Sequence, residues 1–195
     1  MATIGIALFD GFEELDAIGP WEVLSAWTQA HPEDGWSVVT VSRSGAPVTA
    51  AKGLVVTPSH SWASSPPLEV VVYPGGQGTR ALVDDAEELA WIRGLAGSAQ
   101  VMTSVCTGAL VYAAAGLLQG RPATTYWSQF DALLRLEPTV QPRPDDRFVD
   151  DGGVITAAGV SAGIDMALHL VARLAGYDRA RETRRYIQYD PAPPV

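Results

Sequence analysis

Two patterns of apolar positions alternate along the chain. Short runs rich in β-branched residues predict strands, at Ile4–Phe9, Ser37–Ser42, Glu69–Tyr73, Gln100–Val105, Ala123–Thr125, Arg147–Asp150 and Val154–Ala157. Longer segments with apolar residues at helical spacing predict helices, at Ile18–Ala30, Asp84–Ala96, Gly108–Leu118, Ser128–Leu136, Ser161–Leu174 and Ala180–Tyr186. Pro47–Thr57, which Gly53 interrupts, is typical of a small hairpin. Because strands and helices alternate, the sequence predicts an α/β fold with a parallel sheet and helices on both faces.

Three loops of this predicted fold are candidate sites. In open parallel sheets, ligands bind outside the carboxyl ends of the strands. Loops follow the predicted strands at Phe9, Tyr73 and Val105, and each of the three carries residues capable of chemistry. We therefore examine these three loops for a common site.

Cys106 lies at the junction between a predicted strand and a predicted helix. A lone cysteine in a cytosolic protein commonly fills core volume as a small apolar residue. At a helix N-terminus, however, unpaired backbone N–H groups and the helix dipole stabilise an anion and can lower the pKa of a thiol. Gly108 gives room for a sharp turn, as at the nucleophile elbow of α/β-hydrolases. The position favours Cys106 as a nucleophile.

The loop after the first strand is acidic, with Asp10, Glu13, Glu14 and Asp16. A loop of this kind is commonly a solvated turn in which Glu14 or Asp16 helps to cap the next helix. Asp16 differs because Leu15 and Ala17 flank it, which predicts an inward-facing carboxyl group. If it meets Cys106, the two groups titrate as a coupled pair, and a protonated Asp16 can act as a general acid.

The loop after Tyr73 is rich in glycine, from Pro74 to Gly78. It is interpretable as a plain turn, or as a source of free N–H donors at Gly75 and Gly76 that face the thiol and bind an anion or oxyanion. The segment also fits the spacing G-x-G-x-x-[GA], but the acid that a dinucleotide site needs about 20 residues later is absent. We expect no dinucleotide.

Composition narrows the class of protein. The chain has 195 residues, 47% of them apolar, and a net charge of −9, which excludes a disordered chain and disfavours nucleic acid as a partner. No apolar run is long enough to span a membrane, and the start lacks a basic signal-peptide region. We expect one cytoplasmic domain over residues 1–195, with an extended Pro-rich tail at 190–195. The single cysteine and the spacing of the three histidines predict no metal site.

Several segments together resemble the DJ-1/PfpI superfamily, and within it the isonitrile (isocyanide) hydratase branch. They are Leu15–Pro20, Pro74–Gly76, Thr103–Gly108, Ala115–Leu118, Ala123–Trp127, Ser161–Asp165 and Tyr189–Pro194. The resemblance implies a flavodoxin-like three-layer sandwich with a mostly parallel sheet, of the class I glutamine amidotransferase type. It also implies a homodimer that acts on a small molecule without a cofactor.

Individual residues refine the activity that the resemblance implies. Peptidase members carry His directly after the cysteine, where this chain has Thr107, and DJ-1-like members carry Glu in place of Asp16. Hydratase-like members carry His where Tyr126 precedes Trp127, which leaves pocket shape and substrate preference open. Trp127 and Tyr126 are expected to line the substrate pocket, as is Trp62.

The implied reaction is hydration of an isonitrile to an N-substituted formamide. Cys106 serves as the nucleophile, Asp16 as the general acid or base, and Thr107 with the amides of Gly75 and Gly76 orients water or the developing charge. Two alternatives remain open, one an enzyme that uses the same thiol and the other a protein without catalytic activity. One is a glyoxalase-like enzyme acting on 2-oxoaldehydes, and the other is a non-catalytic ligand-binding or redox-sensing module of the kind found in AraC-type regulators.

Overall fold

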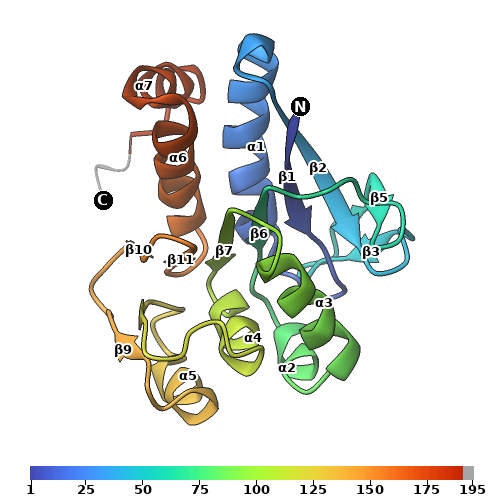
Figure 1. Cartoon of the computed structure of the whole chain (residues 1–195), viewed down its shortest axis with the longest axis vertical. Helices are drawn as coiled ribbons and strands as arrows, with labels where there is room; N and C mark the ends of the chain where they lie inside the picture. Colours follow the sequence, from blue (N-terminus) through green and yellow to red (C-terminus); the bar gives the residue numbers. More distant parts are fainter. Residues whose placement is uncertain (191–195) are drawn as a thin grey trace.

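A seven-stranded sheet forms the centre of the molecule, whose computed structural model describes residues 1–190 (Figure 1). Its strands, in spatial order, are β10 (Phe148–Asp150), β11 (Val154–Ala157), β7 (Val101–Val105), β6 (Val70–Tyr73), β1 (Ala2–Ala7), β2 (Trp36–Ser42) and β5 (His60–Ser61). Every neighbouring pair is parallel except β10 and β11. The carboxyl ends of β1, β6 and β7, from which the three candidate loops depart, are adjacent.

Helices cover both faces of this sheet and complete three layers. On one face, α1 (Glu14–Ala30) and α6 (Ala162–Ala175) pack on alternate residues of β1, such as Ile4 and Ile6. The opposite face carries α3 (Ala86–Ala96), α4 (Gly108–Ala114) and α5 (Phe130–Leu136). The short α2 (Thr79–Leu82) follows the glycine-rich loop, and α7 (Tyr177–Tyr186) ends the described chain. The predicted α/β sandwich is confirmed.

Smaller elements complete the architecture. The predicted hairpin is confirmed as the antiparallel pair of β3 (Val48–Thr49) and β4 (Val55–Val56). The helical turn η1 (Pro32–Asp34), α2, β5 and β9 (Gln141–Pro142) were not predicted; β9 pairs with β8 (Pro122–Ala123), which overlaps the predicted strand Ala123–Thr125. Elements of two to four residues, α2 and β5 among them, are too short to produce a periodic pattern. Residues 191–195 of the predicted extended tail lie outside the described part of the chain.

The boundaries of α1 differ from the prediction in a way that matters for the site. The helix begins at Glu14 rather than Ile18, so Asp16 lies in its first turn and not in a loop. Acidic residues in a first turn interact favourably with the positive end of the helix dipole. Pro20 consequently lies inside the helix instead of in its first turn, where it removes the N–H that would bond to the carbonyl of Asp16.

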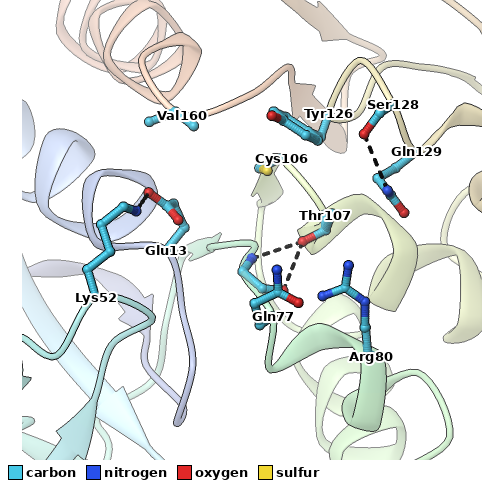
Figure 2. A pocket seen from close by; sticks show the side chains of 11 residues that line it. Glu13, Lys52, Gln77, Arg80, Cys106, Thr107, Tyr126, Ser128, Gln129 and Val160 are labelled. Atoms are coloured by element: carbon cyan, nitrogen blue, oxygen red, sulfur yellow. Dashed lines mark hydrogen bonds and ion pairs between the residues drawn. The ribbon is translucent and has the colours of Figure 1, made fainter.

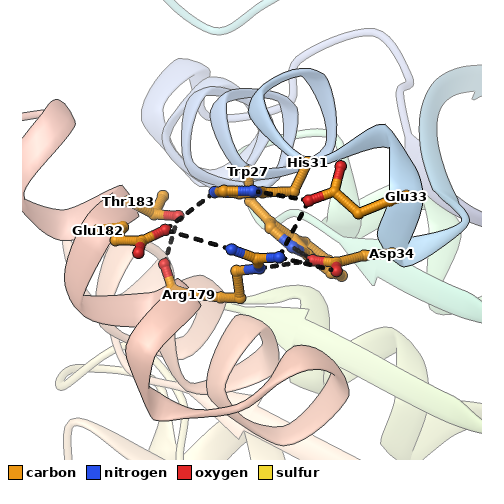
Figure 3. A network of polar contacts seen from close by, with 7 residues as sticks. All are labelled: Trp27, His31, Glu33, Asp34, Arg179, Glu182 and Thr183. Atoms are coloured by element: carbon orange, nitrogen blue, oxygen red, sulfur yellow. Dashed lines mark hydrogen bonds and ion pairs between the residues drawn. The ribbon is translucent and has the colours of Figure 1, made fainter.

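The last helix is held away from the three candidate loops by a polar network (Figure 3). Arg179 of α7 bonds to Asp34 and Glu33 of η1 at 3.1 Å each, and the indole N–H of Trp27 donates to Asp34 at 2.8 Å. These contacts join α7 to the carboxyl end of α1. The network therefore fixes α7 against α1 and η1 and does not contribute to the candidate site.

Candidate active site

Cys106 occupies a strained turn between β7 and α4. Its φ of +57° lies in the left-handed region, which residues other than glycine rarely adopt. The backbone is fixed there because its N–H bonds to the carbonyls of Ala157 and Ala158, and its own carbonyl accepts from the hydroxyl of Thr125 at 2.8 Å. Strain that the surroundings enforce in this manner is concentrated at functional sites.

The cysteine faces a cavity of about 400 Å³ (Figure 2). A cavity of this size accepts a small organic molecule. Although Cys106 is only 6% exposed, it belongs to the lining. The full lining consists of Glu13, Lys52, Gly76, Gln77, Arg80, Cys106, Thr107, Tyr126, Ser128, Gln129 and Val160. The sulfur is therefore within reach of a molecule in the cavity.

Asp16 is fully buried beside this thiol. Its Oδ2 accepts the backbone N–H of Gly75 at 2.9 Å, whereas Oδ1 has no hydrogen-bond partner of ordinary geometry among the described residues. Burial raises the pKa of the Asp16 carboxyl to about 7, the N–H of Gly75 opposes that rise, and the charge of Glu13 adds to it. Around neutral pH the group can give or take a proton, as a general acid–base catalyst must.

The thiol and the carboxyl group are close enough to change each other's pKa. Burial, followed by the charge of Asp16, raises the pKa of Cys106 to about 12, although the backbone N–H groups of Thr107 and Val160 oppose the rise. The prediction of a thiol with a lowered pKa was therefore wrong, because burial and the carboxylate outweigh the helix end. Between about pH 7 and pH 12 the pair holds one proton between its two members.

The glycines of the loop after β6 allow the loops to pack tightly. A Cβ on Gly75 would lie 2.5 Å from the backbone nitrogen of Thr107, and one on Gly76 would lie 2.3 Å from the carbonyl oxygen of Gly11. Both N–H groups already have acceptors, since Gly75 donates to Asp16 and Gly76 donates to the hydroxyl of Thr107 at 2.9 Å. The expectation that they stay free for an oxyanion was wrong. The N–H groups that face the thiol belong to Thr107 and Val160.

The other predicted site residues occupy different positions. Thr107 lines the cavity, but its hydroxyl also accepts from Thr79 at 3.0 Å and so joins two loops. Tyr126 lines the cavity and packs closely on Gly159. Trp127 is 76% exposed and is not part of the lining, contrary to the prediction. Trp62 lies in a separate cavity, stacked on Trp91 with ring centroids 4.5 Å apart.

Several lining residues were missed by the sequence analysis. Lys52, from the β3–β4 hairpin, forms an ion pair with Glu13 across the cavity from Arg80 (Figure 2). Val160 adopts a φ of +48° and contributes its N–H toward the sulfur. No signal in the sequence distinguishes these residues from ordinary loop residues, because tertiary contacts alone bring them together. Residues 1–190 contain no cluster of metal-binding side chains and no helix long and apolar enough to cross a membrane.

Comparison with known proteins identifies the family. The DJ-1/PfpI family model matches residues 2–173, and the chain belongs to that family. The isonitrile hydratase of Pseudomonas putida is 41% identical over 98% of this chain and 80% of its own length. A solved ThiJ/PfpI family protein from Pseudomonas syringae superimposes with a TM-score of 0.90 at 36% identity, over 100% of this chain and 77% of that one.

Transcriptional regulators also contain a related region. The HTH-type transcriptional regulator GbdR of Pseudomonas aeruginosa is 29% identical over 89% of this chain, but the match covers only 47% of the regulator. This chain thus spans about half the length of that relative. The family accordingly includes both an enzyme and regulators.

Proposed function

We propose that this protein hydrates isonitriles to N-substituted formamides, with Cys106 as nucleophile and Asp16 as general acid and base. The observation that carries the proposal is the coupled thiol–carboxyl pair at the edge of a cavity of about 400 Å³. The 41% identity to an isonitrile hydratase, over 98% of the chain, supports this reaction over others that use a thiol.

The first step forms a covalent intermediate. Above pH 7 the resting pair is a thiol beside a carboxylate, since the pKa of Asp16 is raised to about 7 and that of Cys106 to about 12. The sulfur attacks the terminal carbon of R–N≡C while its proton passes by way of Asp16 to that carbon. The product is a thioimidate, R–N=CH–S, attached to the protein. Transfer of the proton during bond formation removes the need for a free thiolate at rest.

The second step releases the product. Water adds to the thioimidate carbon while Asp16 takes a proton from the water and passes it to the nitrogen, which gives R–NH–CH(OH)–S. The carbon–sulfur bond then breaks as the proton of the new hydroxyl group passes by way of Asp16 to the sulfur, which leaves R–NH–CHO and the free thiol. The N–H groups of Thr107 and Val160 stabilise negative charge on the sulfur in both steps. In this scheme Thr107 is a positioning residue, because its hydroxyl joins the turn at Cys106 to Gly76 and Thr79.

The direct test measures formamide production from phenyl isocyanide by the wild-type protein and by Cys106→Ala. We expect the substitution to reduce turnover by at least about a thousandfold, since a covalent route requires its nucleophile. Mass spectrometry of the wild-type protein under turnover should detect the thioimidate adduct. Equal turnover by the two proteins would refute the proposal.

Two other outcomes would favour the alternatives. Consumption of methylglyoxal without isonitrile turnover would indicate a glyoxalase-like enzyme. Absence of both activities, together with tight binding of a small molecule, would indicate a sensing module like the related region of the regulators.

A further inference from the structure

Arg80 is a cation in the cavity whose charge no neighbour neutralises. It lines the cavity together with Cys106, and among residues 1–190 it forms no ion pair and its side chain forms no hydrogen bond. The other cation of the lining, Lys52, is bound to Glu13 and lies 3.3 Å from Glu14. In Figure 2 the guanidinium of Arg80 points toward the cavity beside Gln77, and the Lys52–Glu13 pair lies on the opposite side. One half of the cavity therefore carries an unbalanced positive charge.

The hydrogen bonds that hold the cysteine turn also fix the backbone at Arg80. Its neighbour Thr79 is 1% exposed, and its hydroxyl hydrogen is shared between the carbonyl of Gly76 at 2.8 Å and the hydroxyl oxygen of Thr107 at 3.0 Å. These bonds fix α2 against the turn that contains Cys106. The short helix thus fixes the backbone from which the exposed side chain of Arg80 extends at the rim of the cavity.

The chemistry of this half of the cavity matches a carboxylate. A guanidinium offers paired N–H donors that fit the two oxygens of a carboxylate, and it is always charged. The neutral amide of Gln77 beside it and that of Gln129 elsewhere in the lining add hydrogen-bonding groups without adding charge. The chain as a whole carries −9, so an anionic substrate meets repulsion over the surface in general and needs a local cation to bind.

We propose that Arg80 determines specificity for isonitriles that carry a carboxylate. The substrate lies with its terminal carbon at Cys106 and its carboxylate on the guanidinium of Arg80, away from the Glu13 side of the cavity. This inference rests on the proposed function and adds the substrate class. Arg80 binds the end of the molecule that does not react, so its effect falls on substrate binding and not on the chemical steps.

The test compares 4-isocyanobenzoate with its methyl ester, a pair that differs in the carboxylate charge. Variant Arg80→Gln should raise KM for the acid at least about tenfold, the size of a lost charge-assisted hydrogen bond, with kcat within about twofold. Its kinetics with the ester should stay within about twofold of wild type, which also shows that the variant folds. Arg185→Gln removes an arginine on α7, outside this cavity, and should leave KM and kcat for both substrates unchanged.

A binding measurement adds a readout that does not depend on turnover. Calorimetry should show that 4-formamidobenzoate, the product of the acid, binds Arg80→Gln at least about tenfold more weakly than wild type. Formanilide, the neutral counterpart, should bind both proteins equally. Equal losses for acid and ester, or no loss for either, would overturn the role of Arg80 while the hydratase function stands. If the wild-type protein hydrates neither isonitrile, the proposed function itself fails.

Discussion

Two carboxylic acids are buried at the carboxyl ends of the sheet, on opposite faces, and their surroundings differ. Asp16, on α1, is 0% exposed, and its Oδ1 has no partner of ordinary geometry in the described chain. Glu88, on α3, is 4% exposed, but both of its oxygens are bonded. The hydroxyl of Tyr73 donates to one at 2.8 Å, and Arg43 donates to the other at 3.1 Å.

The difference separates a structural carboxylate from a reactive one. Burial raises the pKa of both groups, yet Glu88 has a cation and a phenol that favour its charged form. Arg43 is itself held over the ring of Trp62, at 4.8 Å from the centroid. Asp16 has one N–H donor and a neighbouring thiol instead of a cation. The burial of a carboxyl group does not by itself indicate catalysis. A buried carboxyl group that lacks a cationic partner and lies next to a cavity does.

The largest contrast is expected in activity. Replacing Asp16 by Asn keeps the shape of the side chain and removes its proton chemistry, so isonitrile hydration should fall by about a hundredfold or more. The same chemical change at the other site, Glu88→Gln, should leave hydration within about threefold of wild type, because that group does not face the cysteine cavity. Formamide production under saturating substrate measures both. Wild-type rates in Asp16→Asn would remove this carboxyl group from the mechanism.

Stability should show the opposite order. Glu88→Ala leaves the buried hydroxyl of Tyr73 without an acceptor and deprives Arg43 of one of its partners. We expect the free energy of unfolding to fall by about 3 kcal/mol. This lies at the low end of the range for breaking a buried ion pair because Arg43 is 40% exposed. Urea denaturation followed by circular dichroism measures the loss. A change below about 1 kcal/mol would mean that the cluster does not stabilise the fold.

The smallest expected effect is a change in the stability of the fold with pH. The pKa of Asp16 is raised from 3.8 to about 7 by folding, so the carboxyl group is protonated in both states below about pH 4. Between pH 4 and 7 the unfolded chain loses this proton first, so the stability that depends on the buried, protonated acid is lost as pH rises and is gone above 7. Asn does not ionise, so the variant does not lose this stability. The free energy of unfolding of Asp16→Asn, relative to that of wild type, should therefore be about 1–3 kcal/mol higher at pH 8 than at pH 4.

Thermal or urea denaturation at the two pH values measures this difference, and both lie below the range where the thiol titrates. Glu88→Gln makes the same measurement at the second buried carboxyl group, whose pKa is also raised; because Tyr73 and Arg43 oppose that rise, its gain over wild type at pH 8 relative to pH 4 should be smaller than that of Asp16→Asn. A difference between Asp16→Asn and wild type that is independent of pH would contradict the raised pKa of Asp16.

Local sequence patterns were sufficient for the order of the longer strands and helices and for the three loops. Val101–Val105 is apolar enough to predict a buried strand, and its connection to an Ala-rich helix placed Cys106 at a turn. The apolar neighbours of Asp16 indicated that it faces inward, which its burial confirms. Trp127 shows the limit of such reasoning, since an aromatic residue next to a lining residue is itself 76% exposed.

The sequence by itself determined which residues lie at the carboxyl ends of the central strands, because hydrophobic periodicity reports local burial and the alternation of β and α elements predicts a parallel sheet. Only the tertiary structure decided the protonation of the pair and the charge of the cavity. The pKa values of Asp16 and Cys106 depend on desolvation and on each other's charge. The charge distribution around the cavity depends on Lys52, which a distant hairpin brings to Glu13, and on Arg80 of α2 on the opposite side. Such quantities depend on distances through space, which spacing along the chain does not contain.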